Sequence, residues 1–499
     1  MTEIILGLDQ GTSSTRCLAL DHNLEQRGAA AVAITASFPG PGLVEQDPAE
    51  LLESARTAIA AALVEAGARP GEVVALGIAN QTETFIVSER RSGRPVHPAI
   101  GWQDRRTAER CAELAAAGHA PAVRARTGLE LDPTFPATKL AWLLDNVAGA
   151  RSAAEAGELS YHDVGGWLAR DLAGFDACEI GNAGRTLLCA LGGESWDDEL
   201  LELFQIPRAL LPPIVASDEL AVHAFGTAAA GAGLPVTGAG LPVTGVLGDQ
   251  QASLFGLGCR RPGTSKVTLG TGAFILAQAG TSAPSPPPGV LASCAWRRRG
   301  VTSYALEGFV PVAGAALDWF AGIGVLPPAA ELDALLSAAG PEDGSVACVP
   351  ALQGLGTPSW DPLTRAALLG LTRATTRAQL ARAVIDGVLH QVADALAAIG
   401  AEMPLATVLL DGGMSRSDWI VQRLADIAAV RVERAVRAEA TAIGAAVMAG
   451  LAAGFWDGEG ELPGIATDLV AEPSWAPEAR ADRRERWAAA LALAVSWRG

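Results

Sequence analysis

A polar turn near the N-terminus carries side chains that could bind the phosphates of a nucleotide. It runs from Asp9 to Arg16, as Asp-Gln-Gly-Thr-Ser-Ser-Thr-Arg, between two apolar segments, which predicts a strand, a tight turn and a second strand. Gly11 permits a sharp bend, and backbone amides and three hydroxyls in the turn suit phosphate oxygens. Those hydroxyls belong to Thr12, Ser13 and Ser14. An ordinary hairpin turn is the alternative interpretation of this octapeptide alone.

Two charged side chains stand at the ends of this turn. Arg16 would add positive charge beside a bound phosphate. The Asp9 carboxylate would repel the phosphate unless a divalent cation lay between them. The pattern therefore favours a nucleotide that is bound together with Mg²⁺.

The same arrangement returns in the second half of the chain. An apolar strand from Lys266 enters the turn Leu269-Gly-Thr-Gly272, which carries Thr271, and a second apolar strand follows. A later strand, 407–410, ends in Asp411-Gly-Gly413 before a helix begins. Two phosphate turns and a later Gly-Gly turn together indicate an actin-like nucleotide fold.

Strands and helices must position these turns, and their alternation along the chain predicts an α/β protein. We expect two actin-like (ribonuclease H-like) domains, 1–247 and 248–499, with a nucleotide and substrate cleft between them. Asp47 and Pro48 mark the start of a helix, with Glu50 closing a capping box. Further expected elements are strands at 29–34 and 73–79, helices at 48–67, 139–146, 161–172 and 377–400, helices starting near 418 and 485, and a surface loop at the tandem heptapeptide 231–244.

Composition argues against several classes of function. The 499-residue chain has a net charge of −18 and a pI near 4.8, which argues against nucleic acid and anionic membranes as partners. Its two lysines, Lys139 and Lys266, do not follow glycine, so the P-loop pattern is absent. Seven cysteines without a CxxC pair fit reduced thiols, and the N-terminus has no signal sequence. The longest apolar run, 442–456, is too short to span a bilayer, so a cytoplasmic protein is expected.

Motifs along nearly the whole chain resemble the FGGY carbohydrate kinase family. They are Asp9-Gln-Gly-Thr-Ser-Ser14, Trp102-Gln-Asp-Arg-Arg-Thr107, Gly248-Asp-Gln-Gln-Ala-Ser-Leu254, Leu269-Gly-Thr-Gly272, Tyr304-Ala-Leu-Glu-Gly308, Trp360-Asp-Pro362 and the stretch from Ala366 to Asp386. Such long ordered matches are specific together, although each alone is weak. Within the family, the chain is most similar to members that act on glycerol. The resemblance implies ATP-dependent phosphorylation of a hydroxyl of glycerol or a closely related polyol.

The resemblance also implies roles for individual residues. Asp249 is the candidate general base, because a neutral alcohol is a poor nucleophile that must lose its proton as the bond to phosphorus forms. A helix-capping aspartate is the alternative. Asp9 and Asp249 would lie near Mg²⁺. The ATP-binding residues would be Thr12, Ser13, Ser14, Arg16, Thr271, Gly314, Asp318, Gly413 and Ser417. Members that act on glycerol tend to have an amide in place of Asp318 and an asparagine in place of Ser417.

The acceptor pocket implied by the resemblance matches only in part. Its residues would be Thr82, Glu83, Trp102, Thr134, Asp249, Gln250 and Phe274. Thr82 stands where members that act on glycerol have arginine, and Thr134 stands where they have tyrosine. The smaller side chains leave space, so another sugar or sugar alcohol, such as a tetritol, pentitol or ketose, could use both threonines as short donors. Alternatively, Arg105 or Arg106 fills the gap and glycerol is still the acceptor.

Functions of other classes stay open as alternatives. An actin-like or chaperone-like ATPase would bind a protein when its domains close around the nucleotide, and it would need no polyol pocket. A binding protein with an inactive kinase site is disfavoured because Asp249 and Thr271 are both present. Kinases of this type often associate, which suggests a homodimer or homotetramer.

Overall fold

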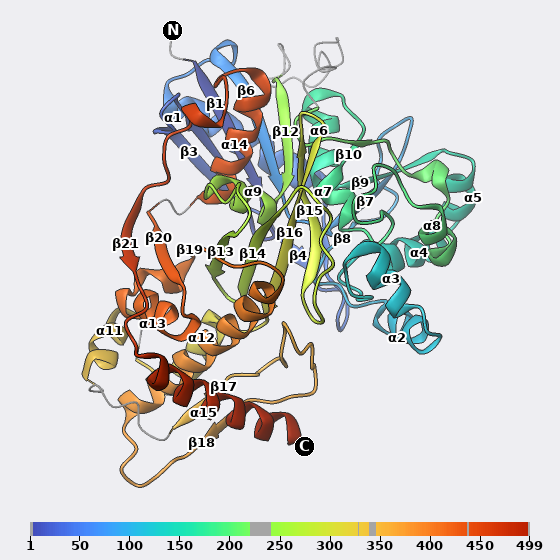
Figure 1. The fold of residues 1–499 in the computed structure, drawn as a ribbon. Helices are drawn as coiled ribbons and strands as arrows, with labels where there is room; N and C mark the ends of the chain where they lie inside the picture. Colours follow the sequence, from blue (N-terminus) through green and yellow to red (C-terminus); the bar gives the residue numbers. More distant parts are fainter. Residues whose placement is uncertain (1–2, 220–240, 328, 339–345, 437–438, 498–499) are drawn as a thin grey trace.

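The computed structural model describes residues 3–219, 241–327, 329–338, 346–436 and 439–497. The N-terminal half is built on a five-stranded sheet in the order β12-β6-β1-β2-β3 (Figure 1). Its strands are β1 (Ile4–Gln10), β2 (Ser14–Leu20), β3 (Gln26–Ala33), β6 (Val73–Asn80) and β12 (Val243–Gly248). The first three strands pair antiparallel, whereas β6 runs parallel to both β1 and β12. The predicted strand, turn and strand around Asp9–Arg16 are therefore confirmed.

The C-terminal half repeats this plan in a seven-stranded sheet in the order β15-β16-β14-β13-β19-β20-β21. Its strands are β13 (Thr264–Leu269), β14 (Ala273–Gly280), β15 (Leu291–Arg298), β16 (Val301–Val310), β19 (Thr407–Asp411), β20 (Arg431–Ala435) and β21 (Thr467–Ala471). In the order β16-β14-β13-β19-β20, the first two pairs of neighbouring strands are antiparallel and the next two are parallel. The order β3-β2-β1-β6-β12 of the N-terminal sheet shows the same pattern. The expected duplication of an actin-like α/β unit is confirmed by this shared order.

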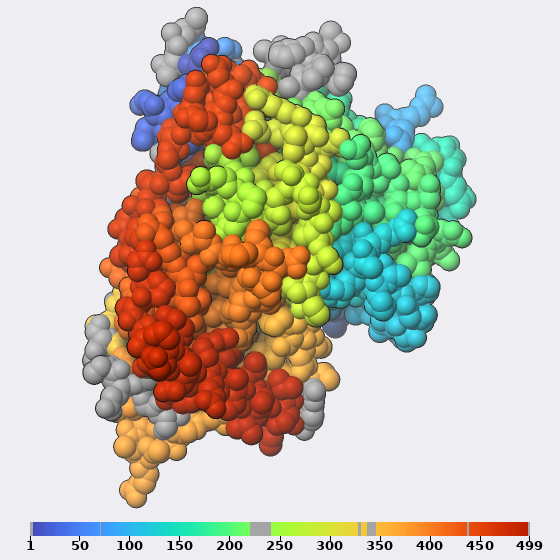
Figure 2. All heavy atoms as spheres, viewed as in Figure 1, coloured from blue at the N-terminus to red at the C-terminus, as the bar shows by residue number. Residues whose placement is uncertain are grey.

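Helix α14 (Ala440–Ala453) ties the two halves together, because it comes from the C-terminal part of the chain yet packs on β1, β6 and β12 (Figure 1). Two glycines make the approach possible. A Cβ atom at Gly7 would lie 2.0 Å from the carbonyl oxygen of Ala442, and one at Gly77 would lie 1.9 Å from that of Ala445. Figure 2 shows orange-red atoms beside blue atoms at this end of the molecule.

Helix α1 (Pro48–Ala66) also packs on the N-terminal sheet, against β2 and β3. Leu6 and Leu8 of β1 belong to the same buried cluster as this helix, whereas Ile5 belongs to the cluster around α14. Successive side chains of a strand point to opposite faces, so the two helices cover opposite faces of the sheet. Asp47 caps α1 by accepting from the amide of Ala49, as predicted.

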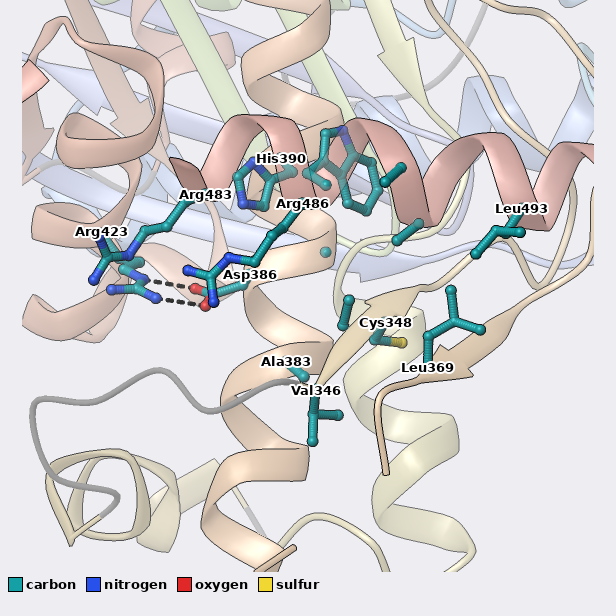
Figure 3. Close-up of a pocket in the computed structure, with 15 residues that line it drawn as sticks. Val346, Cys348, Leu369, Ala383, Asp386, His390, Arg423, Arg483, Arg486 and Leu493 are labelled. Atoms are coloured by element: carbon teal, nitrogen blue, oxygen red, sulfur yellow. Dashed lines mark hydrogen bonds and ion pairs between the residues drawn. The ribbon is translucent and has the colours of Figure 1, made fainter. Parts of the chain in front are cut away.

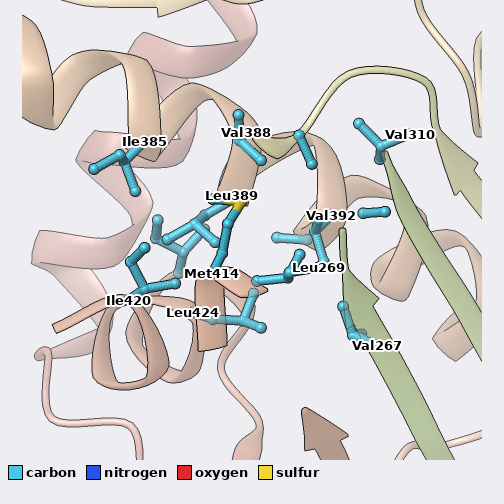
Figure 4. Close-up of a cluster of buried hydrophobic side chains, with 14 of the residues drawn as sticks. Val267, Leu269, Val310, Ile385, Val388, Leu389, Val392, Met414, Ile420 and Leu424 are labelled. Carbon is cyan, nitrogen blue, oxygen red and sulfur yellow. The ribbon is translucent and has the colours of Figure 1, made fainter. Parts of the chain in front are cut away.

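The core of the C-terminal half lies between its sheet and two helices, α12 (Arg377–Glu402) and α13 (Asp418–Ala428). Figure 4 shows Val267 and Leu269 of β13 packed with Val388 and Val392 of α12. Within the described residues, α12 is long and apolar enough to cross a membrane by length and composition alone. However, 72% of its most apolar window is buried inside the structure, so it serves as a core helix.

A smaller lobe carries one wall of the candidate site; most of it is inserted between β6 and β12, and two short strands come from the segment before β6. Its five-stranded sheet has the order β4-β5-β8-β7-β9. Its elements are β4 (Ala36–Ser37), β5 (Glu45–Gln46), β7 (Phe85–Glu89), β8 (Ala99–Ile100), α2 (Ala108–Ala116), α3 (Ala120–Thr127), α4 (Pro136–Asn146), α5 (Ala150–Glu155), β9 (Leu159–Asp163), α6 (Val164–Ala173), β10 (Cys178–Glu179), α7 (Ile180–Gly184), α8 (Asp198–Phe204) and β11 (Ile214–Val215). Elsewhere lie α9 (Asp249–Gly256), α10 (Gly314–Gly322), α11 (Ala329–Ala338), β17 (Ala347–Val349), β18 (Ala367–Leu369) and α15 (Pro477–Ser496).

Some local predictions are corrected by the structure. The helix predicted at 161–172 begins only at Val164, because Tyr161 to Asp163 pair with β7 as part of β9. Glu50 accepts from the amide and hydroxyl of Thr35, which links α1 to the neighbouring strand segment. The last helix begins at Pro477, earlier than expected. Most of the tandem heptapeptide lies outside the described residues, and its end enters β12.

Candidate active site

A cavity of about 370 Å³ is lined by residues from both halves of the chain. All of the predicted acceptor residues line it, namely Thr82, Glu83, Trp102, Thr134, Asp249, Gln250 and Phe274. Their convergence follows from the sheet: β6 and β12 run parallel, with Asn80 opposite Gly248, so the residues after both strands meet at one edge. The structure therefore brings together side chains that are up to 192 positions apart along the chain, from Thr82 to Phe274.

Asp249 is the first residue of α9 and follows directly on β12. It does not cap α9, because Gly248 occupies the capping position, and its Oδ1 accepts from the amide of Gln250 at 2.7 Å. Burial raises the pKa of Asp249 to about 6, with the charge of Glu83 adding to the shift and that of Lys266 opposing it. The helix-capping alternative is thus not what the structure shows, and a carboxylate of raised basicity faces the cavity.

Glu83 is held by a buried arginine that the sequence interpretation missed. Arg185, just after α7, donates to Glu83 Oε1 at 2.5 Å and to Glu307 Oε2 of β16 at 2.5 Å. Burial disfavours the charged guanidinium, but the two carboxylates raise the pKa of Arg185 above its ordinary value. Glu83 has a φ of 62°, in the left-handed region that costs a non-glycine residue about 1–2 kcal/mol. A strained backbone that aims a carboxylate into a cavity is typical of a functional site.

An arginine was predicted to fill the gap beside Thr82. The prediction that Arg105 or Arg106 does so is wrong for Arg106, which pairs with Asp104 and Glu45 and does not line the cavity. Arg105 lines the cavity, but it pairs with Asp132 at 2.9 Å. No local motif marks Arg185 as a partner of Glu83, because the two residues are 102 positions apart.

Thr134, predicted to be a short donor to the acceptor, has a partner for its hydroxyl within the protein. Its hydroxyl donates to Asp132 Oδ1 at 2.6 Å, and its amide donates to the same oxygen at 2.8 Å. Its oxygen can still accept a hydrogen bond, whereas its proton is already committed. The cavity wall at Thr134 is thus polar, with Asp132 and Arg105 paired beside it, and the aromatic residues Phe135 and Trp360 also line the cavity.

The first phosphate turn lies against the acceptor pocket. The amide of Gly11 donates to the carbonyl of Ser14 at 3.0 Å, which closes the turn. Thr12 lines the cavity, and its Oγ1 accepts from the indole of Trp102 at 3.0 Å. Ser13 is exposed, and Arg16 forms an ion pair with Glu439. The turn thus offers a ligand its backbone amides and exposed hydroxyl first.

The second phosphate turn contacts the start of α10. The carbonyls of Gly270 and Thr271 accept from amides at 313–315, and a Cβ atom at Gly314 would lie 2.6 Å from the Gly270 oxygen. Gly314 is therefore adjacent to the turn, and the Thr271 side chain is exposed. Gly412 packs on Leu269 in the same way, which brings the Gly-Gly turn to the end of β13.

The remaining nucleotide residues lie away from the acceptor cavity. Asp318 is exposed on α10, and a Cβ atom at Gly413 would meet nothing within 4 Å. The hydroxyl of Ser417 caps α13 by accepting from Ile420 and donates to Asp333, so it already has structural partners. Of the predicted nucleotide residues, only Thr12 lines the cavity.

Comparison with known sequences decides the family. The N-terminal domain of the FGGY family of carbohydrate kinases matches residues 4–256, and the C-terminal domain of the same family matches residues 265–453. The chain belongs to the FGGY family of carbohydrate kinases. The resemblance expected from the motifs is confirmed, and membership of a kinase family implies the use of ATP.

This FGGY kinase is similar over its full length to curated glycerol kinases. It is 43% identical to that of Aromatoleum aromaticum, with 99% of each chain covered, and 46% identical to that of Methylobacterium nodulans, with 91% of each chain covered. Among solved structures, glycerol kinase from Plasmodium falciparum with ADP matches with a TM-score of 0.92 at 26% identity, over 99% of each chain. Gluconate kinase from Lactobacillus acidophilus matches with a TM-score of 0.87 at 21% identity, over 100% and 99% of the chains. The fold alone therefore does not identify the acceptor.

Two carboxylates of the FGGY kinase form a donor set that fits a divalent cation. Burial, together with the charges of Asp249 and Glu439, raises the pKa of Asp9 to about 7, against the opposing charge of Arg16. In the described part of the chain, no three His, Cys, Asp or Glu residues come close enough to hold a metal ion by themselves. Mg²⁺ is commonly held by one or two carboxylates plus substrate phosphates, so a pair is sufficient.

A second cavity of the FGGY kinase, of about 260 Å³, lies between α12 and α15 (Figure 3). Arg423 forms a two-pronged ion pair with Asp386 there, at 2.7 Å and 2.5 Å. The imidazole of His390 stacks on the indole of Trp487 at 5.2 Å. None of the predicted site residues lines this cavity, which separates it from the candidate active site.

Proposed function

We propose that this FGGY kinase transfers the γ-phosphoryl group of ATP to a hydroxyl of glycerol or a closely related polyol, with Asp249 as the general base. The observation that carries this proposal is the convergence of the acceptor residues, Asp249 among them, on one cavity that the first phosphate turn also lines. The full-length similarity to curated glycerol kinases supports the choice of acceptor.

The chemistry follows from the groups in the cavity. The Asp249 carboxylate accepts the proton of the acceptor hydroxyl as the new oxygen–phosphorus bond forms and ADP leaves with the electrons of the broken bond. A pKa of about 6 makes Asp249 a stronger base than an exposed aspartate, yet leaves it mostly ionised at pH 7. Glu83 accepts from another hydroxyl of the acceptor, and the rings of Trp102 and Phe274 cover its carbon atoms. Amides and hydroxyls of both phosphate turns stabilise the charge on the transferred group.

Asp9 and Asp249 would hold Mg²⁺ together with the phosphates. When bound, the ion supplies positive charge that offsets the negative charge of the nucleotide. The charge of Asp249 adds to the effect of burial in raising the pKa of Asp9, so the two carboxylates lie close enough to interact. The residues therefore fit the ion.

The division of labour between the two halves is part of the proposal. Residues 1–247 would bind the acceptor and carry the first phosphate turn, and residues 248–499 would bind most of the ATP. Residues Arg185 and Glu307, one from each half, meet beside Glu83 and support an acceptor site built from both. A homodimer or homotetramer is proposed for solution, which sedimentation would test.

A coupled assay of ADP release tests the proposed function directly. The rate of ADP release by the purified enzyme is measured with glycerol, tetritols, pentitols and ketoses as acceptors, and the rates are compared. We expect little ADP until glycerol or a close polyol is added, because the general base needs a hydroxyl to act on. If the rate of ATP hydrolysis did not depend on small acceptors but rose when unfolded peptide was added, an actin-like or chaperone-like ATPase would be supported instead.

A second acceptor class, a longer sugar or sugar alcohol, is favoured by the space beside Thr82. We expect Thr82→Arg to raise the ratio of kcat/KM for glycerol over the best longer polyol by about tenfold, because the larger side chain fills that space. Acceptor kinetics of the purified variant measure this ratio. Thr82→Met is the control, since it adds volume without hydrogen-bond donors. An unchanged ranking of acceptors in Thr82→Arg would show that position 82 does not set specificity.

The metal assignment predicts a change in Mg²⁺ dependence. We expect Asp9→Asn to raise the Mg²⁺ concentration for half-maximal activity by about tenfold, because one of two carboxylate ligands is lost. The measurement is a Mg²⁺ titration at saturating ATP and acceptor, with a chelator abolishing turnover in both proteins. Asp21→Asn, which changes an aspartate paired with Arg27 in the β2–β3 turn, is the control. A Mg²⁺ requirement equal to that of the control would remove Asp9 as a ligand.

A further inference from the structure

The chain contains two lysines among its 37 basic residues, and both are completely buried. Lys139 lies on α4 and Lys266 lies on β13, each with 0% of its surface exposed. Burying an ammonium group is costly unless hydrogen bonds compensate for the lost water. The other 35 of these 37 residues are arginines.

Lys266 bonds to a residue of the acceptor cavity. Its Nζ donates to the side-chain oxygen of Gln250 at 2.8 Å and to Thr268 Oγ1 at 3.1 Å. An ammonium group can only donate, so the carboxamide oxygen of Gln250 must face the lysine. The NH₂ group is then the part of the amide that remains for a ligand, and Gln250 lines the cavity. Lys266 thereby makes Gln250 a hydrogen-bond donor.

Lys139 lies behind another wall of the same cavity. Its Nζ donates to the carbonyl of Gly101 at 2.9 Å and to the carbonyl of Thr134 at 2.8 Å. Gly101 directly precedes Trp102, whose indole lines the cavity, and Thr134 lines it as well. One buried lysine therefore joins the two segments that carry these side chains.

A compact ammonium suits both places better than a guanidinium. An arginine has a planar fork with five donors and more volume, and enlarging a fully buried side chain forces its neighbours to move. The alternative interpretation is that both lysines have only a structural role, in which each donates hydrogen bonds to nearby carbonyl groups of the core. That alternative does not require both lysines of the chain to bond to residues of one cavity, as they do here.

We propose that Lys266 and Lys139 are positioning residues of the acceptor site: Lys266 fixes the Gln250 amide as a donor to the acceptor, and Lys139 fixes the Trp102 and Thr134 segments relative to each other. This inference rests on the proposed function, because it assigns both lysines to the binding of the polyol. Neither lysine lies among the residues lining the cavity, so both act through others.

A double-mutant cycle tests the role of Lys266. We expect Lys266→Met to raise the acceptor KM by about tenfold while the ATP KM stays within about twofold, because the Gln250 amide loses its fixed orientation. In a Gln250→Ala background, Lys266→Met should add less than about twofold, since the group it orients is gone. Additive effects, or equal rises in both KM values, would overturn the assignment.

Lys139→Met should raise the acceptor KM by about tenfold as well, with the ATP KM again nearly unchanged. The matched control is Arg382→Met, which removes a buried cation that donates to the Leu336 carbonyl in the C-terminal half. We expect that control to lower the melting temperature without changing the acceptor KM. An acceptor KM of Lys139→Met equal to that of the control would overturn the role of Lys139.

A crystal structure of Lys266→Met gives a readout that does not depend on activity. We expect the Gln250 amide to leave its position when the ammonium is gone. The acceptor screen tests the proposed function separately: a wild-type enzyme that phosphorylates no polyol would overturn that function. The crystal structure of Lys266→Met tests the positioning role, and a Gln250 amide that keeps its position would overturn that role.

Discussion

Asp249→Asn is expected to lower kcat/KM for the acceptor by about 10³-fold, within the range found when a general base is removed. Asparagine has nearly the same shape, but it cannot take the proton of the acceptor hydroxyl. The loss should fall on kcat, measured by ADP release at saturating ATP. Nucleotide binding should persist, because the phosphate turns are unchanged.

The same variant should fold at least as well as the wild-type protein. The pKa of Asp249 rises on folding from 3.8 to about 6, so the folded protein binds this proton more tightly than the unfolded chain does. Its contribution to stability therefore falls as pH rises through that interval, and it stays unfavourable at neutral pH. In metal-free buffer, the melting temperature of Asp249→Asn relative to wild type should increase from pH 4 to pH 6.

The control for this prediction is Asp47→Asn, the same substitution at the cap of α1, where asparagine is an equally good cap. It should leave both activity and stability close to wild type. Turnover of Asp249→Asn near that of the control would remove Asp249 as the base.

Arg185→Met is expected to lower the free energy of unfolding by about 3–5 kcal/mol, because it leaves the buried carboxylates of Glu83 and Glu307 without their shared partner. The side chains of the three residues are 12%, 6% and 9% exposed, so water cannot take over that role. Denaturant unfolding measures the change. The acceptor KM should rise with it, since Glu83 lines the cavity.

Arg105→Met provides the matched control for Arg185→Met. It breaks an ion pair with Asp132 in the same cavity, but the Arg105 side chain is 49% exposed. An exposed pair contributes about 0–1 kcal/mol, so the control should unfold almost like wild type. Equal losses in the two variants would show that the buried triad has no special role.

The two phosphate turns could be predicted from sequence because each is a continuous stretch. Gly11 and the hydroxyls beside it form one bend between two apolar strands, and the same holds for Thr271. The geometry of a short turn depends on neighbouring residues alone, so its chemistry can be recognised without the fold. The cap at Asp47 was predictable for the same reason.

Local patterns were insufficient where one segment can form two structures. The segment from Tyr161 onward suits a helix, but Tyr161 to Asp163 pair with β7 and continue the sheet of the smaller lobe. Glu50 stands where it could close a capping box, yet the neighbouring Thr35 offers it an amide and a hydroxyl. Partners from outside the segment decided both outcomes.

The sequence by itself determined the family, the nucleotide turns and the residue types around the acceptor, since these are stretches of adjacent residues whose order can be read directly. Only the tertiary structure decided that Arg185 pairs with Glu83, that Thr134 donates its proton to Asp132, and that both lysines lie behind one cavity. The reason is that these contacts join side chains on different elements. Their existence depends on how the sheets and helices pack, and no spacing along the chain encodes that packing.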